Sequence, residues 1–295
     1  MTEANEMIDV RPGWHIDPDT LVPVLDDEAG FRQAHADDPA VEVLIELWSG
    51  QPGRAAELLE PLVSDDPTWR LRALAADVIG ARGNPAAAIT VLEQLVEQHR
   101  YQPPEGILAQ HLGLAHYAAA AFPAAASWFR RALDLSTEPG ADSALAGSGQ
   151  FLDRALERVP ETISHTRAWS WGVAFLYDPV HGDVVDVDPD VPVTTTPTGL
   201  DVMVRHAQEY DWANGQEGPA VTTMHIARPD KDTTPHRAVV VEATLETPTR
   251  SLSIGDAEGQ ILVPVPAAHT RVVISHGDAE WCSPDQVWID LYAGT

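Results

Sequence analysis

Two hydrophobic periods divide this chain into a helical part and a strand part. From Pro39 to Val159, apolar residues recur at the three- and four-residue spacing of amphipathic helices. From Trp169 onward, apolar and polar residues alternate in short runs separated by Gly, Asp and Pro, which is typical of half-buried strands. Pro160 stands between the two patterns. We therefore predict an α + β protein, with a helical domain followed by an antiparallel β-sandwich or barrel-like domain over residues 161–295.

The helical part contains a repeat that aligns on proline. The segments QPGRAAELLEPL, NPAAAITVLEQL and FPAAASWFRRAL place Pro52, Pro85 and Pro123 at the start of a helix, where proline's missing N–H is no loss. An apolar helix precedes each segment, so each pair forms a hairpin that cannot bury its apolar face alone. We predict an array of three hairpins over residues 38–160, closed by a capping helix within residues 142–159.

The third hairpin carries the residues that connect the array to a known family. They are Leu112, Gly113, Tyr117, Ala125, Phe129 and Ala132. This pattern of small and aromatic residues resembles the tetratricopeptide repeat. The resemblance implies that first helices of successive hairpins line a concave surface and that this surface binds an extended or helical peptide. The run from Glu242 to the C-terminus resembles a β-sandwich domain of actinobacterial proteins, and that resemblance implies no activity.

The register of the repeat predicts which side chains line the concave surface. They are Leu44, Leu47, Trp48, Arg70, Ala73, Asp77, Gln110, Leu114 and Tyr117. We expect Trp48 and Tyr117 to be the anchors, because aromatic residues carry a large share of interface energy. Arg70 is placed to orient a carboxylate. The alternative is that this surface packs against the β-domain or against residues 1–37, an Asp- and Pro-rich strap or helix.

The charge of the chain restricts the choice of partner. There are 18 Lys and Arg residues against 45 Asp and Glu, a net charge of −27. Both halves share this excess, with 11 basic and 25 acidic residues in 1–160 and 7 and 20 in 161–295. Such a field repels nucleic acid and anionic membranes and favours a basic protein. An immunity-type inhibitor of a basic toxin is therefore one alternative. The first residues lack a signal-peptide pattern, so we expect a cytoplasmic protein.

The sharpest polar pattern is the acidic stretch 183–190. Alternation would place Asp186, Asp188 and Asp190 on one face of a strand, and three carboxylates suit Ca²⁺. The stretch lacks the Gly and Glu that complete an EF-hand loop, because Val191 and Pro197 occupy those positions. A charged edge strand that resists aggregation explains the same pattern. We therefore predict no metal site here.

Catalytic motifs are missing from the sequence. It contains no GxSxG, no P-loop and no GxGxxG. We predict no catalytic residues and no cofactor, and a non-catalytic protein-interaction adaptor as the function. The rival hypothesis is an enzyme or small-ligand binder that uses the β-domain, with Asp186, Asp188, His206 and Cys282 as its residues. We expect the strand tryptophans to lie in the sandwich core: Trp169, Trp171, Trp281 and Trp288.

Overall fold

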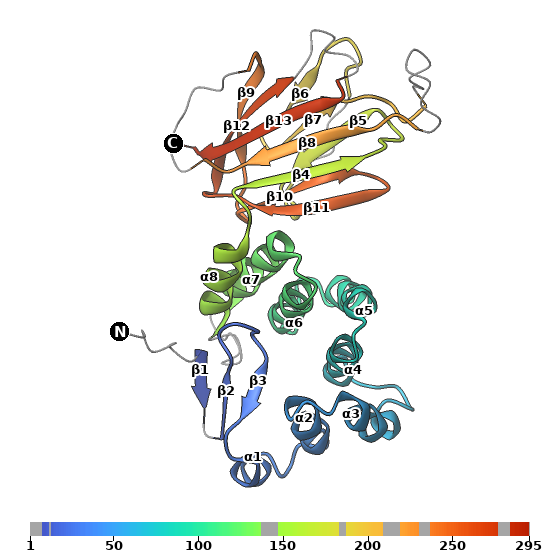
Figure 1. The fold of residues 1–295 in the computed structure, drawn as a ribbon, viewed down its shortest axis with the longest axis vertical. Coiled ribbons are helices and arrows are strands. Elements are labelled where there is room, and N and C mark those ends of the chain that lie inside the picture. The colour runs from blue at the N-terminus through green and yellow to red at the C-terminus, as the bar shows by residue number, and fades with distance from the viewer. Residues whose placement is uncertain are drawn as a thin grey trace. The chain divides into compact units, whose positions relative to one another are not determined.

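Helices dominate the first half of the computed structural model, and strands make up the second half, as the hydrophobic periods predict (Figure 1). The structure describes residues 8–11, 13–136, 147–182, 187–208, 219–229, 237–276 and 284–294. The chain forms two compact units, Met1–Val159 and Pro160–Thr295.

The first unit begins with a small antiparallel sheet in the order β1-β2-β3. Its strands are β1 (Ile8–Arg11), β2 (Trp14–Ile16) and β3 (Pro23–Leu25). Trp14 lies opposite Leu25 in the register, so the two side chains share one face of the sheet. Helix α1 (Glu28–Ala34) follows, and Asp27 caps it by accepting the N–H of Gly30. The described part of residues 1–37 therefore holds a sheet as well as a helix.

Three helical hairpins and a further helix complete the first unit. The helices are α2 (Val41–Trp48), α3 (Pro52–Leu59) with its 3-10 extension η1 (Glu60–Leu62), α4 (Trp69–Ala81), α5 (Pro85–Gln98), α6 (Glu105–Ala118), α7 (Phe122–Ser136) and α8 (Ser148–Arg158). Gly50 and Gly83 end the first helix of two hairpins with φ of 74° and 90°, a conformation that glycine adopts without strain. In the third turn Ala120 takes this role with φ of 57°. No helix among the described residues has the length and hydropathy needed to cross a membrane.

The packing of α6 against α7 depends on one glycine. A Cβ atom added at Gly113 of α6 would lie 2.5 Å from the ring carbons Cδ1 and Cε1 of Phe129 on α7. Only glycine therefore lets α6 approach the fully buried Phe129 ring. The Phe129 ring also lies 5.5 Å from the ring of Phe151, centroid to centroid. Phe129 thus joins the third hairpin to α8.

The second unit contains two five-stranded sheets. One has the order β11-β10-β5-β7-β6 and the other β4-β8-β13-β12-β9. The strands are β4 (Thr162–Arg167), β5 (Val173–Tyr177), β6 (Val193–Thr195), β7 (Gly199–Met203), β8 (Thr222–Ala227), β9 (Val239–Glu246), β10 (Ser251–Asp256), β11 (Gly259–Pro264), β12 (His269–His276) and β13 (Gln286–Ala293). Strands β8 and β13 pair in parallel, and the other pairs are antiparallel. The second unit is thus mixed and not wholly antiparallel.

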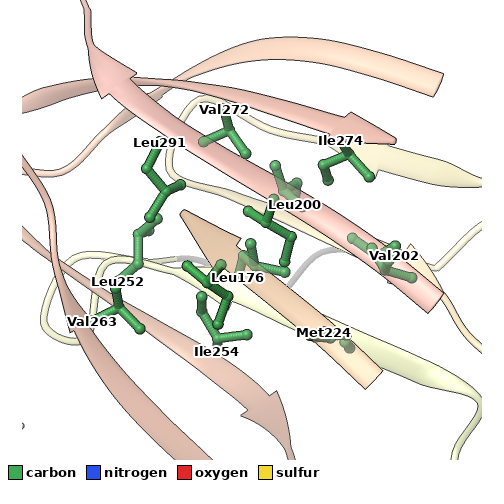
Figure 2. Close-up of a cluster of buried hydrophobic side chains, with 14 of the residues drawn as sticks. Leu176, Leu200, Val202, Met224, Leu252, Ile254, Val263, Val272, Ile274 and Leu291 are labelled. Carbon is green, nitrogen blue, oxygen red and sulfur yellow. The ribbon is translucent and has the colours of Figure 1, made fainter. Parts of the chain in front are cut away.

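One hydrophobic core joins the two sheets (Figure 2). Leu176, Leu200 and Leu252 come from the first sheet, and Val272 and Leu291 come from the second. In each strand, alternate residues enter this core, as the period of two predicts. The unit is therefore a two-layer arrangement of sheets held together by buried aliphatic side chains.

The prediction that the strand tryptophans fill the core is correct for one of them and wrong for two. Trp169 is fully buried in the core, whereas Trp171 is 66% exposed. Trp288 lies on the outer face of β13, because its neighbours Val287 and Ile289 point into the core. There its ring stacks on the His225 ring at 5.1 Å. Trp281 lies outside the described residues.

Candidate protein-interaction surface

The N-terminal sheet lies inside the arc formed by the helices of the first unit (Figure 1). It contacts α2 at one end and α6 at the other, the two helices that carry the predicted anchors Trp48 and Tyr117. We call the side of the array that carries these two residues the inner surface.

Aromatic packing joins the sheet to α2. The ring of Trp48 lies 5.0 Å from the ring of Trp14 on β2 and 5.2 Å from the ring of Phe31 on α1, centroid to centroid. Leu25 and Leu44 belong to the same cluster. Helical spacing explains the contribution of α2, since positions four residues apart lie on the same face. Trp48 is therefore already packed against the chain's own N-terminal segment.

A hydrogen bond joins the sheet to α6. The Oη atom of Tyr117 donates to the backbone carbonyl of Asp19 at 3.1 Å, in the turn between β2 and β3. The Tyr117 side chain is 7% exposed, and its ring meets Phe122 edge-on at 5.2 Å. The second predicted anchor is thus buried, and its hydroxyl is bonded to the same segment.

The turn that Tyr117 contacts is organised by a carboxylate. Oδ1 of Asp17 accepts the backbone N–H groups of Asp19 at 3.0 Å and Thr20 at 2.8 Å, together with the Thr20 hydroxyl at 2.8 Å. The hydrogen bonds from Thr20 hold the pKa of the Asp17 carboxyl below its usual value. Local hydrogen bonds of this kind favour a turn, and Leu21 within it is 1% exposed. These hydrogen bonds hold the turn that carries the Asp19 carbonyl.

Between the two ends, polar side chains of the array pair with one another. Arg70 donates to both carboxylate oxygens of Asp38, so its guanidinium is engaged within the chain. Asp77 pairs with His111 at 2.9 Å between Oδ2 and Nδ1. Burial by itself lowers the pKa of His111, but the charge and hydrogen bond of Asp77 outweigh it, and the net effect is a raised pKa.

The remaining predicted residues have structural contacts as well. Gln110 accepts a hydrogen bond at 3.1 Å from the hydroxyl of Ser148 on α8. Leu47 packs in the cluster between the first and second hairpins, and Ala73 is buried in the next cluster. Leu114 is half-buried. Ala73 is 1% exposed, so it belongs to the core between hairpins and does not line a surface as predicted.

The sequence indicates only some of the residues that contact the predicted lining. Trp14 and Phe31 are conspicuous apolar residues in the polar segment 1–37, which is what suggested a strap there. Asp19, Asp38 and His111 gave no comparable indication. Asp19 contributes a backbone carbonyl, and no residue type identifies such a contact in advance.

The structure describes two residues of the rival hypothesis, Asp188 and His206, and each has its own local hydrogen bond. Asp188 is exposed and accepts the backbone N–H of Asp190 at 3.0 Å. The Nδ1 atom of His206 accepts the N–H of Gln208 at 3.0 Å. Asp186 and Cys282 lie outside the described residues. Within the described ranges, no group of three or more His, Cys, Asp or Glu side chains is arranged to hold a metal ion.

Two buried carboxylates of the second unit, Asp178 and Asp256, have structural hydrogen bonds. Asp178 is fully buried and accepts from the N–H groups of Val180, His181 and Thr249 and from the Thr249 hydroxyl, at 2.8 to 3.0 Å. Arg167 binds the buried Asp256 at 2.7 Å and its guanidinium lies over the Trp169 ring. These hydrogen bonds fix turns and tie strands together.

Comparisons with known proteins leave the family open. No protein-family model matches the chain, and no curated protein matches it. Among solved structures, a similarity is found to the crystal structure of ComJ from Bacillus subtilis, an inhibitor of the DNA-degrading activity of NucA. It has 7% sequence identity and a TM-score of 0.31, and covers 45% of this chain and 96% of ComJ. A TM-score this low does not establish a common fold, so the function proposed below rests on the geometry of this chain.

Proposed function

We propose that this protein is a non-catalytic protein-interaction adaptor whose helical array binds an extended segment of another polypeptide on its inner surface. The observation that supports this most directly is that the surface already holds extended chain, the sheet β1–β3. The contacts are aromatic packing on Trp48 and a hydrogen bond from Tyr117 to a main-chain carbonyl. Every polypeptide offers carbonyl groups, and many offer aromatic side chains, so another chain can make the same contacts.

The assignment to the tetratricopeptide repeat type is part of this proposal. It is supported by three consecutive helical hairpins and by the fit of the Phe129 ring over Gly113 in the third one. Repeat arrays of this kind provide extended concave surfaces for binding. The proposal thus locates the partner on the helices that carry Trp48, Arg70 and Tyr117.

Charge supports a basic partner. The net charge of −27 is divided almost equally between the two halves of the sequence, so a cationic protein is attracted from a wide range of directions. Inhibition of a basic toxin, as by an immunity protein, is the second candidate function and uses the same charge. Under either function, the association rate falls as salt is added, because exposed charges are screened.

The test is affinity capture from the native host with tagged full-length protein, followed by binding kinetics at two ionic strengths. The baits are the wild type, Trp48→Ala, and Glu57→Ala as a matched control, since Glu57 is exposed on α3. We expect a basic protein to be retained by the wild type and by Glu57→Ala, and to dissociate at least about tenfold faster from Trp48→Ala. Equal retention by a folded Trp48→Ala protein would show that the inner surface is not the binding site.

A further inference from the structure

Strand β9 stands at the edge of its sheet, so only one of its two sides is paired. On that side β12 matches it residue by residue, from Val241 opposite Ile274 to Glu246 opposite His269. The other side of an edge strand offers backbone N–H and C=O groups to which a further strand can add. We call this side of β9 the free edge.

One hydrogen bond shows which backbone groups face the free edge. The N–H of Glu246 points away from β12 and donates to the carbonyl of Pro197, in the turn between β6 and β7, at 2.8 Å. Backbone direction alternates along a regular antiparallel strand, and the register is regular from Val241 onward. The N–H and C=O groups of Glu242 and Thr244 therefore point away from β12 as well. Among the described residues, no backbone group pairs with them on that side.

The exposure of the side chains shows that the free edge is open. Glu242 and Thr244 are exposed. Ala243 faces the core but is only half-buried, whereas Val272 and Ile274 on the neighbouring β12 are fully buried. The core-facing side of β9 is therefore left partly uncovered at the free edge.

The other edges of the two sheets are protected. Arg167 on the edge strand β4 donates to the carbonyl of Gly259 on the edge strand β11 at 2.9 Å, and it binds Asp256 at 2.7 Å. The edge strand β6 has three residues, and a short edge pairs poorly with another chain. With eight residues, β9 is the longest edge strand described in the second unit.

The side chains of β9 define which strand can be added. The exposed carboxylates of Glu242 and Glu246 lie on its outer face, with Thr244 between them. A second copy of β9 paired antiparallel about Thr244 would set these carboxylates against each other, and like charges in opposite positions are unfavourable. A strand with Lys or Arg at alternate positions is attracted instead. The residues between its cations face the half-buried Ala243, so they are apolar.

We propose that the free edge of β9 is a second binding site, which takes an extended segment of alternating basic and apolar residues as an added strand. The main chain of the segment pairs with Glu242 and Thr244, and its cations lie beside Glu242 and Glu246. The net charge of −27 favours a partner that carries such a segment. The site lies in the second unit and does not rest on the inner surface of the helical array, so either proposal can fail alone.

The probe is a fluorescein-labelled synthetic peptide, Lys-Val-Lys-Val-Lys-Val-Lys, and the readout is its fluorescence anisotropy with full-length protein. A second peptide with proline in place of the central valine keeps every charge but pairs poorly as a strand. General attraction to an acidic protein is the same for both peptides. We expect the first to bind at least about tenfold more tightly, because only it completes the backbone hydrogen bonds. Equal affinities would show that charge alone attracts the peptide and would overturn the proposal.

Three variants locate the binding on the protein. Thr244→Pro removes one N–H from the free edge and leaves the pairing with β12 in place, since the Thr244 backbone points the other way. Glu246→Lys reverses a charge beside the edge, and Asp153→Lys makes the same change of net charge at an exposed position of α8. We expect the first two to weaken binding by about threefold or more, and Asp153→Lys to leave it nearly unchanged. Equal weakening by Glu246→Lys and Asp153→Lys would contradict a local site.

Hydrogen exchange of the wild type tests the site without any substitution. In the free protein, we expect the amides of Glu242 and Thr244 to exchange fast and those of Ala243 and Leu245, which face β12, to exchange slowly. Saturating peptide should slow the first two and leave the other two unchanged. Slow exchange of Glu242 and Thr244 in the free protein would mean that the edge is covered. Unchanged exchange with bound peptide would mean that the peptide binds elsewhere, and either result overturns the proposal.

Discussion

The Oη atom of Tyr117 donates a hydrogen bond of 3.1 Å to the backbone carbonyl of Asp19, across 98 residues of sequence. This contact joins the third hairpin to the turn between β2 and β3. Together with the packing of Trp14 on Trp48, it places the N-terminal segment along the surface that the repeat register assigns to a partner.

Tyr117→Phe keeps the ring and removes only the hydroxyl. We expect local opening of β2 and β3 to become easier by about 1 kcal/mol, a usual net value for one hydrogen bond. Hydrogen exchange of amides in residues 13–26 measures this opening. Tyr101→Phe is the matched control, because Tyr101 is 74% exposed and its hydroxyl has no role in the sheet. Equal exchange rates in the two variants would mean that the hydrogen bond to Asp19 contributes nothing.

Gly113→Ala tests the close approach of α6 and α7. The added methyl group would lie 2.5 Å from the Phe129 ring, so the ring or the helix has to move, and we expect a loss of roughly 1–3 kcal/mol of stability. Gly53→Ala in α3 is the control, since a Cβ at Gly53 meets nothing within 4 Å. That variant should gain up to about 1 kcal/mol, because alanine favours the helix. Urea unfolding of both proteins gives the comparison, and a harmless Gly113→Ala contradicts the packing described.

Arg131→Met removes one partner of a buried ion pair. Arg131 donates to Oε1 of Glu105 at 2.6 and 2.9 Å, and the Glu105 side chain is 5% exposed. We expect a loss of roughly 3–5 kcal/mol, since the carboxylate is left buried without its cation. Arg54→Met breaks the exposed pair with Glu57 and should cost less than about 1 kcal/mol. Thermal unfolding of the two variants should differ clearly, and similar melting temperatures would contradict this account.

Asp201 makes the stability of the second unit depend on pH. Burial, with a smaller contribution from the Asp188 charge, raises the pKa of Asp201 from 3.8 to about 6. Between these values the unfolded chain releases a proton that the folded chain retains, so stability falls as pH rises through this window and remains lower above it. Asp201→Asn cannot ionise. We expect it to be more stable than the wild type at about pH 8, by on the order of 2 kcal/mol, and to lose this advantage near pH 4.

Urea unfolding at the two pH values, with the exposed Asp190→Asn as the control, tests this prediction. The difference between Asp201→Asn and the wild type should grow with pH, whereas that of Asp190→Asn should not. A difference that is independent of pH would show that the Asp201 carboxyl titrates in the folded protein as it does in the unfolded chain.

The sequence by itself determined the elements and their order. The spacing of apolar residues predicted helices up to Val159 and strands after Pro160, because each period reflects which side chains one face can bury. The aligned prolines located the second helix of each hairpin, and Pro52 and Pro85 do stand first in α3 and α5. The pairing of small and aromatic residues likewise anticipated the contact between Gly113 and Phe129. All of these follow from local pattern.

Only the tertiary structure decided which surfaces meet. Arg70 could bind a partner's carboxylate or one of its own chain, and its contact is Asp38, 32 residues away. Alternation could not tell the inner face of β13 from the outer one, because a shift by one residue exchanges them, and Trp288 lies outside. The parallel pairing of β8 with β13 joins distant segments. Local pattern could not predict the hydrogen bond from Tyr117 to the Asp19 carbonyl either. A backbone carbonyl is present at every residue, so only the folded chain selects the one that the hydroxyl meets.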